Sequence, residues 1–298
     1  MRKTCRKLRI FKMNITSQTI EKTIRDYIDA SPENTLQNGA NEKAFSTPLV
    51  GFASGADPIF ADYKTHVGPF HWTPADAFAL AFPDLNVQSD ALTVITYILP
   101  QTQATKSDNR KEDRYPSERW ARARIFGEEV NEKLRRHVVS TLQDAGVAAA
   151  APSLMTQWET KTSEQYGYAS TWSERHAAHA CGLGTFGLCD GLITPLGKAM
   201  RVGSVIARIR IPPTERPYDN HRAYCLFFSK GVCKKCASRC PVGAISEAGK
   251  DKVKCLGHLR PVTADHVKTH YGFDGYGCGL CQTGVPCESK IPLPPDGQ

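Results

Sequence analysis

Two stretches of the chain place an apolar residue at every fourth position, and each predicts a helix with one buried face. Residues 17–29 have this spacing through Ile20, Ile24 and Ile28. A longer stretch begins after Pro116-Ser117 and ends at Gly146, which are typical helix boundaries. A stripe of this kind is typical of a helix that packs on a sheet. In the longer stretch the stripe consists of Phe126, Val130, Leu134, Val138 and Leu142.

Short runs of β-branched and other apolar residues predict the strands. The clearest run is residues 93–99, TVITYIL, which Pro100 ends. Weaker runs predict strands at residues 49–53, 146–151, 191–194 and 204–211. The segment between Pro100 and Pro116 is expected to be a charged loop. Because strands and helices alternate over residues 93–211, we expect an α+β fold in which helices flank one central sheet.

The chain divides near residues 212–222, PPTERPYDNHR, which are rich in proline and polar side chains. We therefore expect a basic tail and a helix over residues 1–45, a core domain over residues 46–215, and a smaller domain over residues 216–298. In this smaller domain, few apolar residues separate the cysteines. Such a segment cannot build a sizeable core alone, so bound metal must supply much of its folding free energy.

The net charge of the 298-residue chain is +8, and six lysines and arginines, with no acid, lie in the first twelve residues. The rest of the chain is nearly neutral, so its charge is weak evidence for a nucleic-acid partner. The sequence contains no apolar run of about 18 residues that would span a membrane. The polar residues after the basic N-terminus are unlike a secretory signal. We therefore expect a cytoplasmic protein without a membrane partner.

Eight of the eleven cysteines lie between residues 225 and 287. In a chain without an export signal, clustered thiols indicate metal binding rather than disulfides. Cys233, Cys236 and Cys240 have the spacing C-x2-C-x3-C, and Pro241 follows. This pattern ends the bacterial ferredoxin run, in which the last cysteine binds the second of two clusters.

The remaining cysteines complete two sets of four. The usual run has another cysteine at the position of Lys230, and Cys225, five residues earlier, is assigned that role. Cys278 and Cys281 form a second C-x2-C pair, and Cys287 follows after five residues instead of three. We predict one [4Fe–4S] cluster on a first set and another on a second set. The first set is Cys225, Cys233, Cys236 and Cys287, and the second set is Cys240, Cys255, Cys278 and Cys281.

Zinc is the alternative, because two C-x2-C pairs match a four-cysteine zinc site. Zinc would leave four cysteines without a role, and it does not require the C-x3-C-P step. Two clusters are therefore the preferred interpretation. Cys181 and Cys189 lie outside both sets and are expected to be buried free thiols.

Gly182, Gly184 and Gly187 match the pattern G-x-G-x-x-G. A dinucleotide site with this pattern needs a strand before it and a helix after it. Here a helical stretch precedes the glycines and a strand follows them, so we reject the dinucleotide interpretation. The glycines are expected to permit a tight turn or the close approach of a flat ligand.

The stretch SERHAAHACGLGTFG at residues 173–187, followed by LITPLG at residues 192–197 and by Gly203, resembles the cobalamin-dependent epoxyqueuosine reductase and reductive dehalogenase superfamily. Order and spacing agree over about residues 165–290, although Cys181 stands where the family has an alanine. The resemblance implies a nitroreductase-like core, a ferredoxin-like domain with two [4Fe–4S] clusters, and a bound cobalamin. The residues that would face the cobalamin are Gly182, Gly184, Gly187, Gly197 and Gly203.

The resemblance also implies a reaction in which reduced cobalt acts on the substrate and a nearby acid delivers a proton. Epoxyqueuosine reductases have an aspartate six residues before the helix glutamate, and here Tyr168 stands six residues before Glu174. Reductive dehalogenases use a tyrosine in a similar place, so we expect Tyr168 to be the acid. A phenol needs a nearby positive charge to become a better acid, and Arg201 is the candidate.

The expected function is that of a reductase that passes electrons from its clusters to cobalamin. Its partners would be an external low-potential electron donor, such as flavodoxin or ferredoxin, and a small-molecule or modified-nucleoside substrate. One alternative is a ferredoxin-type electron carrier without a substrate of its own. Another is a tRNA epoxyqueuosine reductase, which Tyr168 and the nearly neutral body of the chain disfavour.

Overall fold

The computed structural model describes residues 14–293, so the predicted basic tail lies outside the described residues. The helices are α1 Ser17–Ala30, α2 Ile59–Val67, α3 Pro74–Ala81, α4 Gln103–Lys111, α5 Glu118–Asp144, α6 Glu174–Ala180, α7 Leu226–Lys230, α8 Lys235–Ser238, α9 Lys252–Gly257 and α10 Thr263–Tyr271. The strands are β1 Leu49–Ser54, β2 Thr93–Pro100, β3 Ala149–Ala150, β4 Thr160–Ser163, β5 Gly167–Ser170, β6 Thr185–Phe186, β7 Leu192–Ile193, β8 Met200–Ala207, β9 Ile245–Ser246 and β10 Gly249–Lys250. None of the helices within residues 14–293 is both long and apolar enough to cross a membrane.

A four-stranded sheet with the order β1-β2-β8-β3 lies at the centre of the molecule, and all its pairings are antiparallel. Thr93 pairs with Ala207 and Pro100 with Met200, so β2 and β8 are aligned along their full length. All eight residues of β2 are buried, as its β-branched sequence predicts. The prediction of one central sheet flanked by helices is confirmed.

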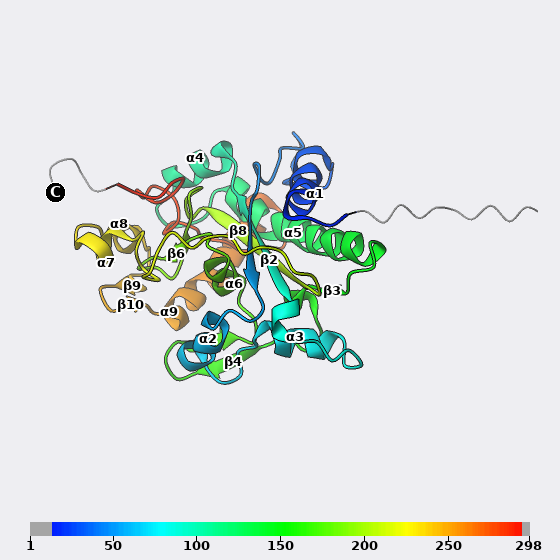
Figure 1. The fold of residues 1–298 in the computed structure, drawn as a ribbon. Coiled ribbons are helices and arrows are strands. Elements are labelled where there is room, and N and C mark those ends of the chain that lie inside the picture. Colours follow the sequence, from blue (N-terminus) through cyan, green and yellow to red (C-terminus); the bar gives the residue numbers. More distant parts are fainter. Residues whose placement is uncertain (1–13, 294–298) are drawn as a thin grey trace, which may run out of the picture.

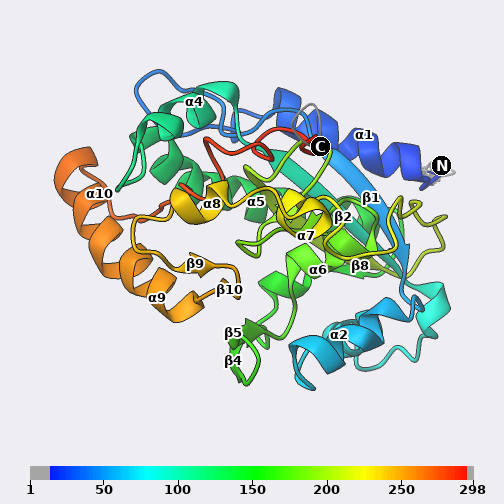
Figure 2. The same ribbon diagram turned by 90° about the vertical axis from the view of Figure 1, so that its left-hand side faces the viewer.

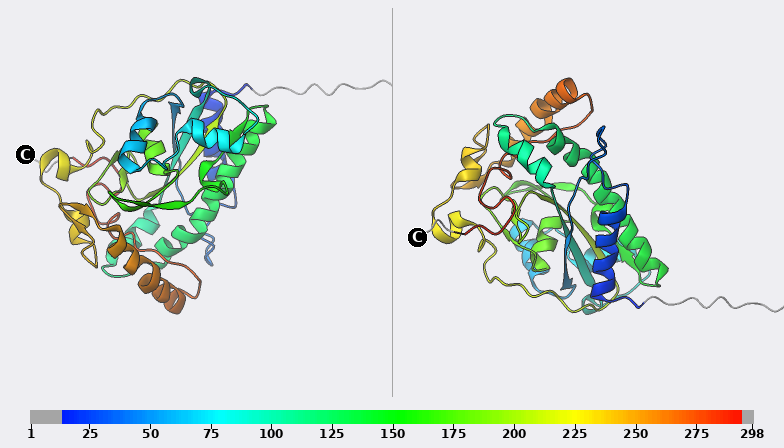
Figure 3. Two further views of the ribbon diagram at one scale, coloured as in Figure 1. Left: turned by 90° about the horizontal axis from the view of Figure 1, so that it is seen from below. Right: turned by 90° about the horizontal axis from the view of Figure 1, so that it is seen from above.

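Helices cover both faces of the sheet (Figure 1). Helices α1 and α5 lie side by side on one face, where Ile24 and Leu134 pack against Ile95 and Val205 (Figure 3, right). Helices α2, α3 and α6 cover the other face, which β8 reaches through Ile206. The alternation of side chains along each strand divides the core into these two layers.

The long periodic elements lie where the sequence predicts them, and the short ones are shifted. Ser117 caps α5 by accepting a hydrogen bond from the Trp120 N–H. The strand predicted at residues 146–151 is only Ala149–Ala150, and the strand predicted at residues 204–211 runs instead over Met200–Ala207. The predicted charged loop contains a helix, α4.

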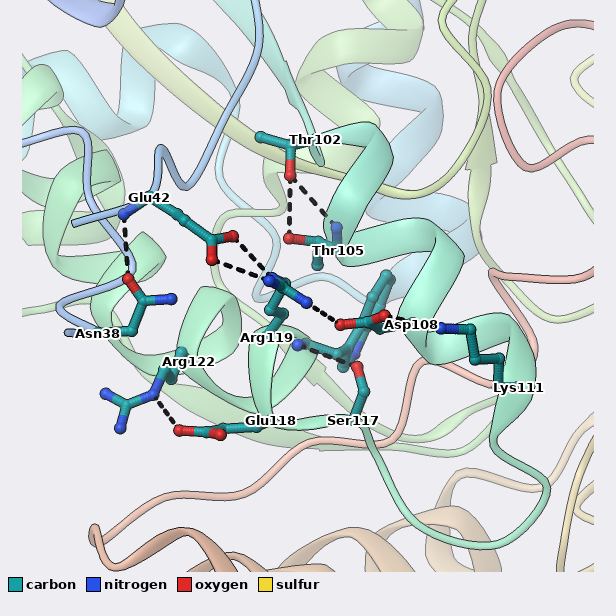
Figure 4. Close-up of polar contacts among 11 residues, drawn as sticks. Asn38, Glu42, Thr102, Thr105, Asp108, Lys111, Ser117, Glu118, Arg119 and Arg122 are labelled. Atoms are coloured by element: carbon teal, nitrogen blue, oxygen red, sulfur yellow. Dashed lines mark hydrogen bonds and ion pairs between the residues drawn. The ribbon is translucent and has the colours of Figure 1, made fainter. Parts of the chain in front are cut away.

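An arginine network fixes α4 against α5. The Arg119 guanidinium at the start of α5 donates to both carboxylate oxygens of Glu42, at 2.6 and 2.8 Å, and also pairs with Asp108 of α4 (Figure 4). Thr102 caps α4 by accepting a hydrogen bond from the Thr105 N–H. Polar anchors of this kind explain why a helix without an apolar stripe forms here.

The cysteine-rich part of the chain packs directly on α4. Figure 2 shows α7, α8, β9, β10 and α9 at one end of the sheet, with the C-terminal segment between them and α4. The Asn109 side chain donates to the Cys278 carbonyl at 3.2 Å, and the Lys106 ammonium donates to the Ser289 hydroxyl at 2.8 Å. Arg110 of α4 pairs with Glu288. Helix α4 is therefore the platform that holds the C-terminal cysteines.

Candidate functional site

The four cysteines of the predicted first set line one pocket. Cys225 precedes α7, Cys233 precedes α8, Cys236 lies in α8, and Cys287 comes from the C-terminal segment. The Cys225, Cys236 and Cys287 side chains are buried, and Cys233 is half-buried. Apolar side chains complete the wall, among them Leu188, Ile193, Leu226 and Val285. The structure thus brings together thiols that are up to 62 positions apart in the sequence.

Helix α7 explains how Cys225 joins this pocket from its unusual position. The helix is five residues long and ends at Gly231, whose φ of 72° lies in the left-handed region that glycine tolerates. The chain then turns back, and the Val232 N–H donates to the Leu226 carbonyl at 3.2 Å. One short helical turn therefore returns the chain so that Cys233 faces the same pocket as Cys225.

The turn before β8 delivers Cys287. The Lys198 N–H donates to the Cys287 carbonyl at 2.9 Å, and the Ala199 N–H donates to the Glu288 carbonyl at 3.1 Å. Gly197 has a φ of 79°, and a Cβ there would lie 2.1 Å from the Glu288 carbonyl oxygen. Only glycine allows this close approach, so Gly197 holds the C-terminal segment against the core.

The wall of the pocket also contains the buried side chain of Lys198. Its ammonium donates to the Cys189 sulfur at 3.3 Å. Burial alone would lower the pKa of Lys198, but the surrounding thiol groups of Cys189, Cys287 and Cys236 outweigh burial and raise it. The pocket therefore combines four thiols with one buried cation.

In the second predicted set, Cys278 lies near Cys255 and Cys240. Burial raises the pKa of Cys278 to about 11, and the nearby thiols of Cys255 and Cys240 add to this shift. The Cys240 sulfur accepts a hydrogen bond from the Ala244 N–H at 3.2 Å. Cys281 instead contacts Cys189. Within residues 14–293, no three histidine, cysteine or acidic side chains converge as one bound ion would require.

Cys189 and Cys181 are both buried, as expected, but their surroundings differ. Cys181 lies under the sheet, with its sulfur 3.3 Å from the Thr96 hydroxyl, and burial raises its pKa to about 12. Cys189 contacts the thiols of Cys236 and Cys281, and these hydrogen bonds lower its pKa. Cys189 thus lies between the two predicted sets, a position that its spacing in the sequence did not reveal.

Tyr168 lies in β5, opposite Thr162 of β4, and its side chain is half-buried. The nearby cation is Lys252 of α9. The Lys252 ammonium donates to the Tyr168 carbonyl at 2.9 Å and lies 5.4 Å from the centre of the Tyr168 ring. Lys252 is also close enough to Asp190 to interact with it electrostatically.

Arg201 lies elsewhere, and within residues 14–293 no hydrogen bond or ion pair joins it to Tyr168. Arg201 belongs to β8 and faces α5, where its Nε is 4.0 Å from a Glu128 carboxylate oxygen. Burial lowers its pKa to about 10. The predicted pairing of Tyr168 with Arg201 is not formed, because β8 presents this side chain to α5 while Tyr168 lies in the β4–β5 hairpin beside α9.

The other predicted glycines pack closely against the protein itself. A Cβ on Gly182 would lie 2.4 Å from the Glu215 carbonyl oxygen, and one on Gly184 would lie 2.3 Å from the Ile193 carbonyl oxygen. A Cβ on Gly203 would lie 2.3 Å from the Tyr97 hydroxyl. Gly187 lines the cysteine pocket. The predicted contacts of these glycines with cobalamin remain predictions.

Comparison with known proteins finds similar solved structures, but no family model and no curated protein matches the chain. Epoxyqueuosine reductase from Bacillus subtilis is 18% identical, with a TM-score of 0.44 over 82% of this chain and 62% of that chain. An epoxyqueuosine reductase with a tRNA-Tyr epoxyqueuosine-modified stem loop is 17% identical, with a TM-score of 0.48 over 93% and 68%. A reductive dehalogenase described as B12-dependent is 14% identical, with a TM-score of 0.46 over 82% and 30%.

These solved structures represent the same two kinds of protein that the sequence resembles. The chain spans 62% of the length of the Bacillus subtilis protein and 30% of the dehalogenase.

Proposed function

We propose that this chain is an iron–sulfur oxidoreductase that holds two [4Fe–4S] clusters and passes electrons to a cobalamin for reductive chemistry. The observation that carries the proposal is the pocket lined by Cys225, Cys233, Cys236 and Cys287. When bound, the clusters supply one-electron transfer. The chain holds them through thiolates, excludes water with the apolar wall, and offsets their negative charge with Lys198.

The donor set of the pocket fits a thiolate-ligated cluster better than a single zinc ion. A structural zinc ion draws four ligands to about 2.0–2.3 Å from one point. A single zinc ion would therefore account for only four of the eight clustered cysteines, whereas two clusters account for all eight. A buried lysine beside thiols also favours a group with net negative charge.

The cobalamin part of the proposal rests on the sequence resemblance. A Cβ at Gly182, Gly184, Gly197 or Gly203 would meet the protein's own atoms, so close packing within the protein is sufficient to explain these glycines. This observation favours a second candidate function, a ferredoxin-type electron carrier whose core domain serves as a docking platform. In both functions an external flavodoxin or ferredoxin would reduce the clusters.

Tyr168 is the proposed proton donor. Its ring lies beside the Lys252 ammonium, which would stabilise the phenolate left after proton transfer. The residue that supplies the positive charge in this proposal is Lys252 instead of Arg201. Tyr168→Phe would remove the proton while keeping the ring, so turnover should fall about 100-fold or more with the clusters intact. Unchanged turnover would remove Tyr168 from the proposal.

The deciding experiment is anaerobic purification followed by iron analysis, ultraviolet–visible spectra and electron paramagnetic resonance. We expect about eight irons per chain, two cluster signals and retention of added cobalamin. About eight irons with no retained cobalamin would support the electron carrier instead. Bound zinc without iron would overturn both candidate functions.

Two substrates separate the reductase classes. Reduced methyl viologen would serve as the electron donor, with either a brominated hydroxybenzoic acid or an epoxyqueuosine-modified tRNA stem loop as the acceptor. We expect a small molecule to be reduced, because Tyr168 stands where the epoxyqueuosine reductase pattern has an aspartate. Turnover of only the stem loop would instead assign the chain to tRNA modification.

A further inference from the structure

Lys198 is a buried cation with thiols around it. It lies in the turn between β7 and β8, and its side chain is 3% exposed. Its ammonium contacts the Cys189 sulfur at 3.3 Å and lies close enough to the Cys287 thiol to interact with it electrostatically. The backbone N–H of the same residue donates to the Cys287 carbonyl, so Lys198 is fixed to the pocket at two points.

No carboxylate neutralises this charge. In the part of the chain that the structure describes, Lys198 forms no ion pair with an aspartate or glutamate. Burying an ammonium without an anionic partner is costly, so the Lys198 ammonium requires negative charge in the pocket itself. The thiols of Cys236, Cys281, Cys287 and Cys189 are the groups placed to provide it.

Cys189 fixes the direction of the Lys198 side chain. It contacts one thiol from each predicted set, Cys236 and Cys281, and it accepts the lysine hydrogen bond. The Lys198–Cys189 pair therefore lies between the positions of the two proposed clusters. A fixed positive charge at this place acts on both, and most strongly on the cluster whose pocket Lys198 lines.

We propose that Lys198 raises the reduction potential of the cluster held by Cys225, Cys233, Cys236 and Cys287, and that Cys189 positions it for this role. The inference rests on the proposed function. In the relevant step an external one-electron donor, of the flavodoxin or ferredoxin class, is oxidised as the cluster gains one electron and one unit of negative charge. A buried cation and hydrogen bonds to the ligand sulfurs stabilise this more negative form.

The test is a redox titration of the anaerobic, cluster-loaded protein followed by electron paramagnetic resonance. The signal lost in Cys225→Ser identifies the cluster of the pocket. Lys198→Met should shift the reduction potential of that cluster to a more negative value, with about eight irons retained. The reduction potential of the other cluster should shift less. In Lys198→Arg, which keeps the charge, the reduction potential of the cluster of the pocket should stay closer to its value in the unaltered protein. Lys230→Met is the matched control, because Lys230 is exposed to solvent on α7 and its charge is screened.

Unchanged potentials in Lys198→Met, with about eight irons present, would overturn the inference while leaving the proposed function intact. If Lys198→Met loses iron, Cys189→Ala decides, because it keeps the lysine charge and removes only the partner that directs it. We expect Cys189→Ala to retain about eight irons and to shift the same cluster. Loss of iron or an unshifted potential in Cys189→Ala would overturn the positioning role. Absence of any cluster in the unaltered protein would instead end the proposed function itself.

Discussion

Cys225 and Cys287 reach the cysteine pocket from opposite ends of the cysteine-rich segment. Cys225 lies at the start of α7, whose single turn compensates for its distance from Cys233. Cys287 is held by backbone hydrogen bonds to the turn before β8. Each thiol is therefore placed by a local structure of its own, and each can be removed without altering the other.

Serine substitution of either residue should remove one cluster. Cys225→Ser and Cys287→Ser are each expected to lower the iron content from about eight to about four per chain, with one resonance signal lost. Cys181→Ser is the control, because Cys181 is also buried but lies under the sheet beside Thr96. Full iron retention in Cys225→Ser or Cys287→Ser would contradict the assignment of the first set.

At the residue scale, spacing in the sequence was informative only within the cysteine-rich segment. It grouped Cys225, Cys233, Cys236 and Cys287, which the structure gathers around one pocket. It could not find Lys198, because this lysine comes from a core turn whose distance to the thiols depends on the tertiary fold. For the same reason it paired Tyr168 with Arg201, whereas the fold places Lys252 beside Tyr168.

At the element scale, the start of α5 anchors the platform beneath the C-terminal cysteines. Ser117 caps α5, and its own N–H donates to the Asn109 side chain of α4 at 2.9 Å. Ser117→Ala removes the cap and should lower the free energy of unfolding by about 1 kcal/mol. Anaerobic urea unfolding measures this change. Ser140→Ala, at an exposed position of the same helix, should change stability by less than about 0.5 kcal/mol.

The ion pair between Arg110 and Glu288 joins α4 to the C-terminal segment. The Glu288 side chain is 5% exposed, and the Arg110 Nε donates to its carboxylate at 2.8 Å. Arg110→Met would leave a buried carboxylate without its partner. We expect the free energy of unfolding to fall by roughly 2 kcal/mol. This is less than for a fully buried pair, because Arg110 is 41% exposed. Lys111→Met, at a neighbouring position that is 74% exposed, is the control.

The same ion pair predicts a dependence on pH. Burial would raise the pKa of Glu288, but hydrogen bonds from Arg110 and the Gly284 N–H outweigh burial and lower it. Its stabilisation is therefore fully present above the ordinary carboxyl pKa of about 4.3, and it is lost as the pH falls through the lowered pKa of the folded protein. The difference in the free energy of unfolding between Arg110→Met and the unaltered protein should shrink below about pH 4. An equal difference at neutral and acidic pH would assign the effect to packing.

The elements that the sequence predicted well are those whose burial is periodic. Helices α1 and α5 and strand β2 each bury a regular set of apolar residues. Helix α4 was missed because its buried residues, Thr105, Lys106 and Asn109, are polar and are fixed by distant partners. The short strand β3 has only two residues, too few for a pattern to set its limits.

At the scale of the whole molecule, the two parts of the chain draw their stability from different sources. The sheet is sandwiched between two apolar layers and contains the fully buried strand β2. The segment from α7 to α9 has few buried apolar residues, and one of its few buried side chains is Cys236, a predicted cluster ligand. The Arg239 guanidinium donates to the Leu280 carbonyl at 3.0 Å and to the Asn109 carbonyl of α4 at 3.2 Å, so it holds this segment to the C-terminal residues and to α4.

Removal of iron should therefore unfold the segment from α7 to α9 and leave the central sheet folded. Anaerobic chelation is expected to raise amide hydrogen exchange across residues 226–257 by about 100-fold or more, because metal binding supplies much of the folding free energy there. Amides of β2 and β8 should stay protected, since their hydrogen bonds lie within the central sheet. The C-terminal segment should lose protection in part, because Asn109 and Arg110 of α4 still hold it. Mass spectrometry of exchanged peptides measures all three regions in one experiment. Simultaneous loss of protection in β2 would show that the clusters stabilise the whole molecule as one cooperative unit. The central sheet, with its two apolar layers, would then not be stable on its own.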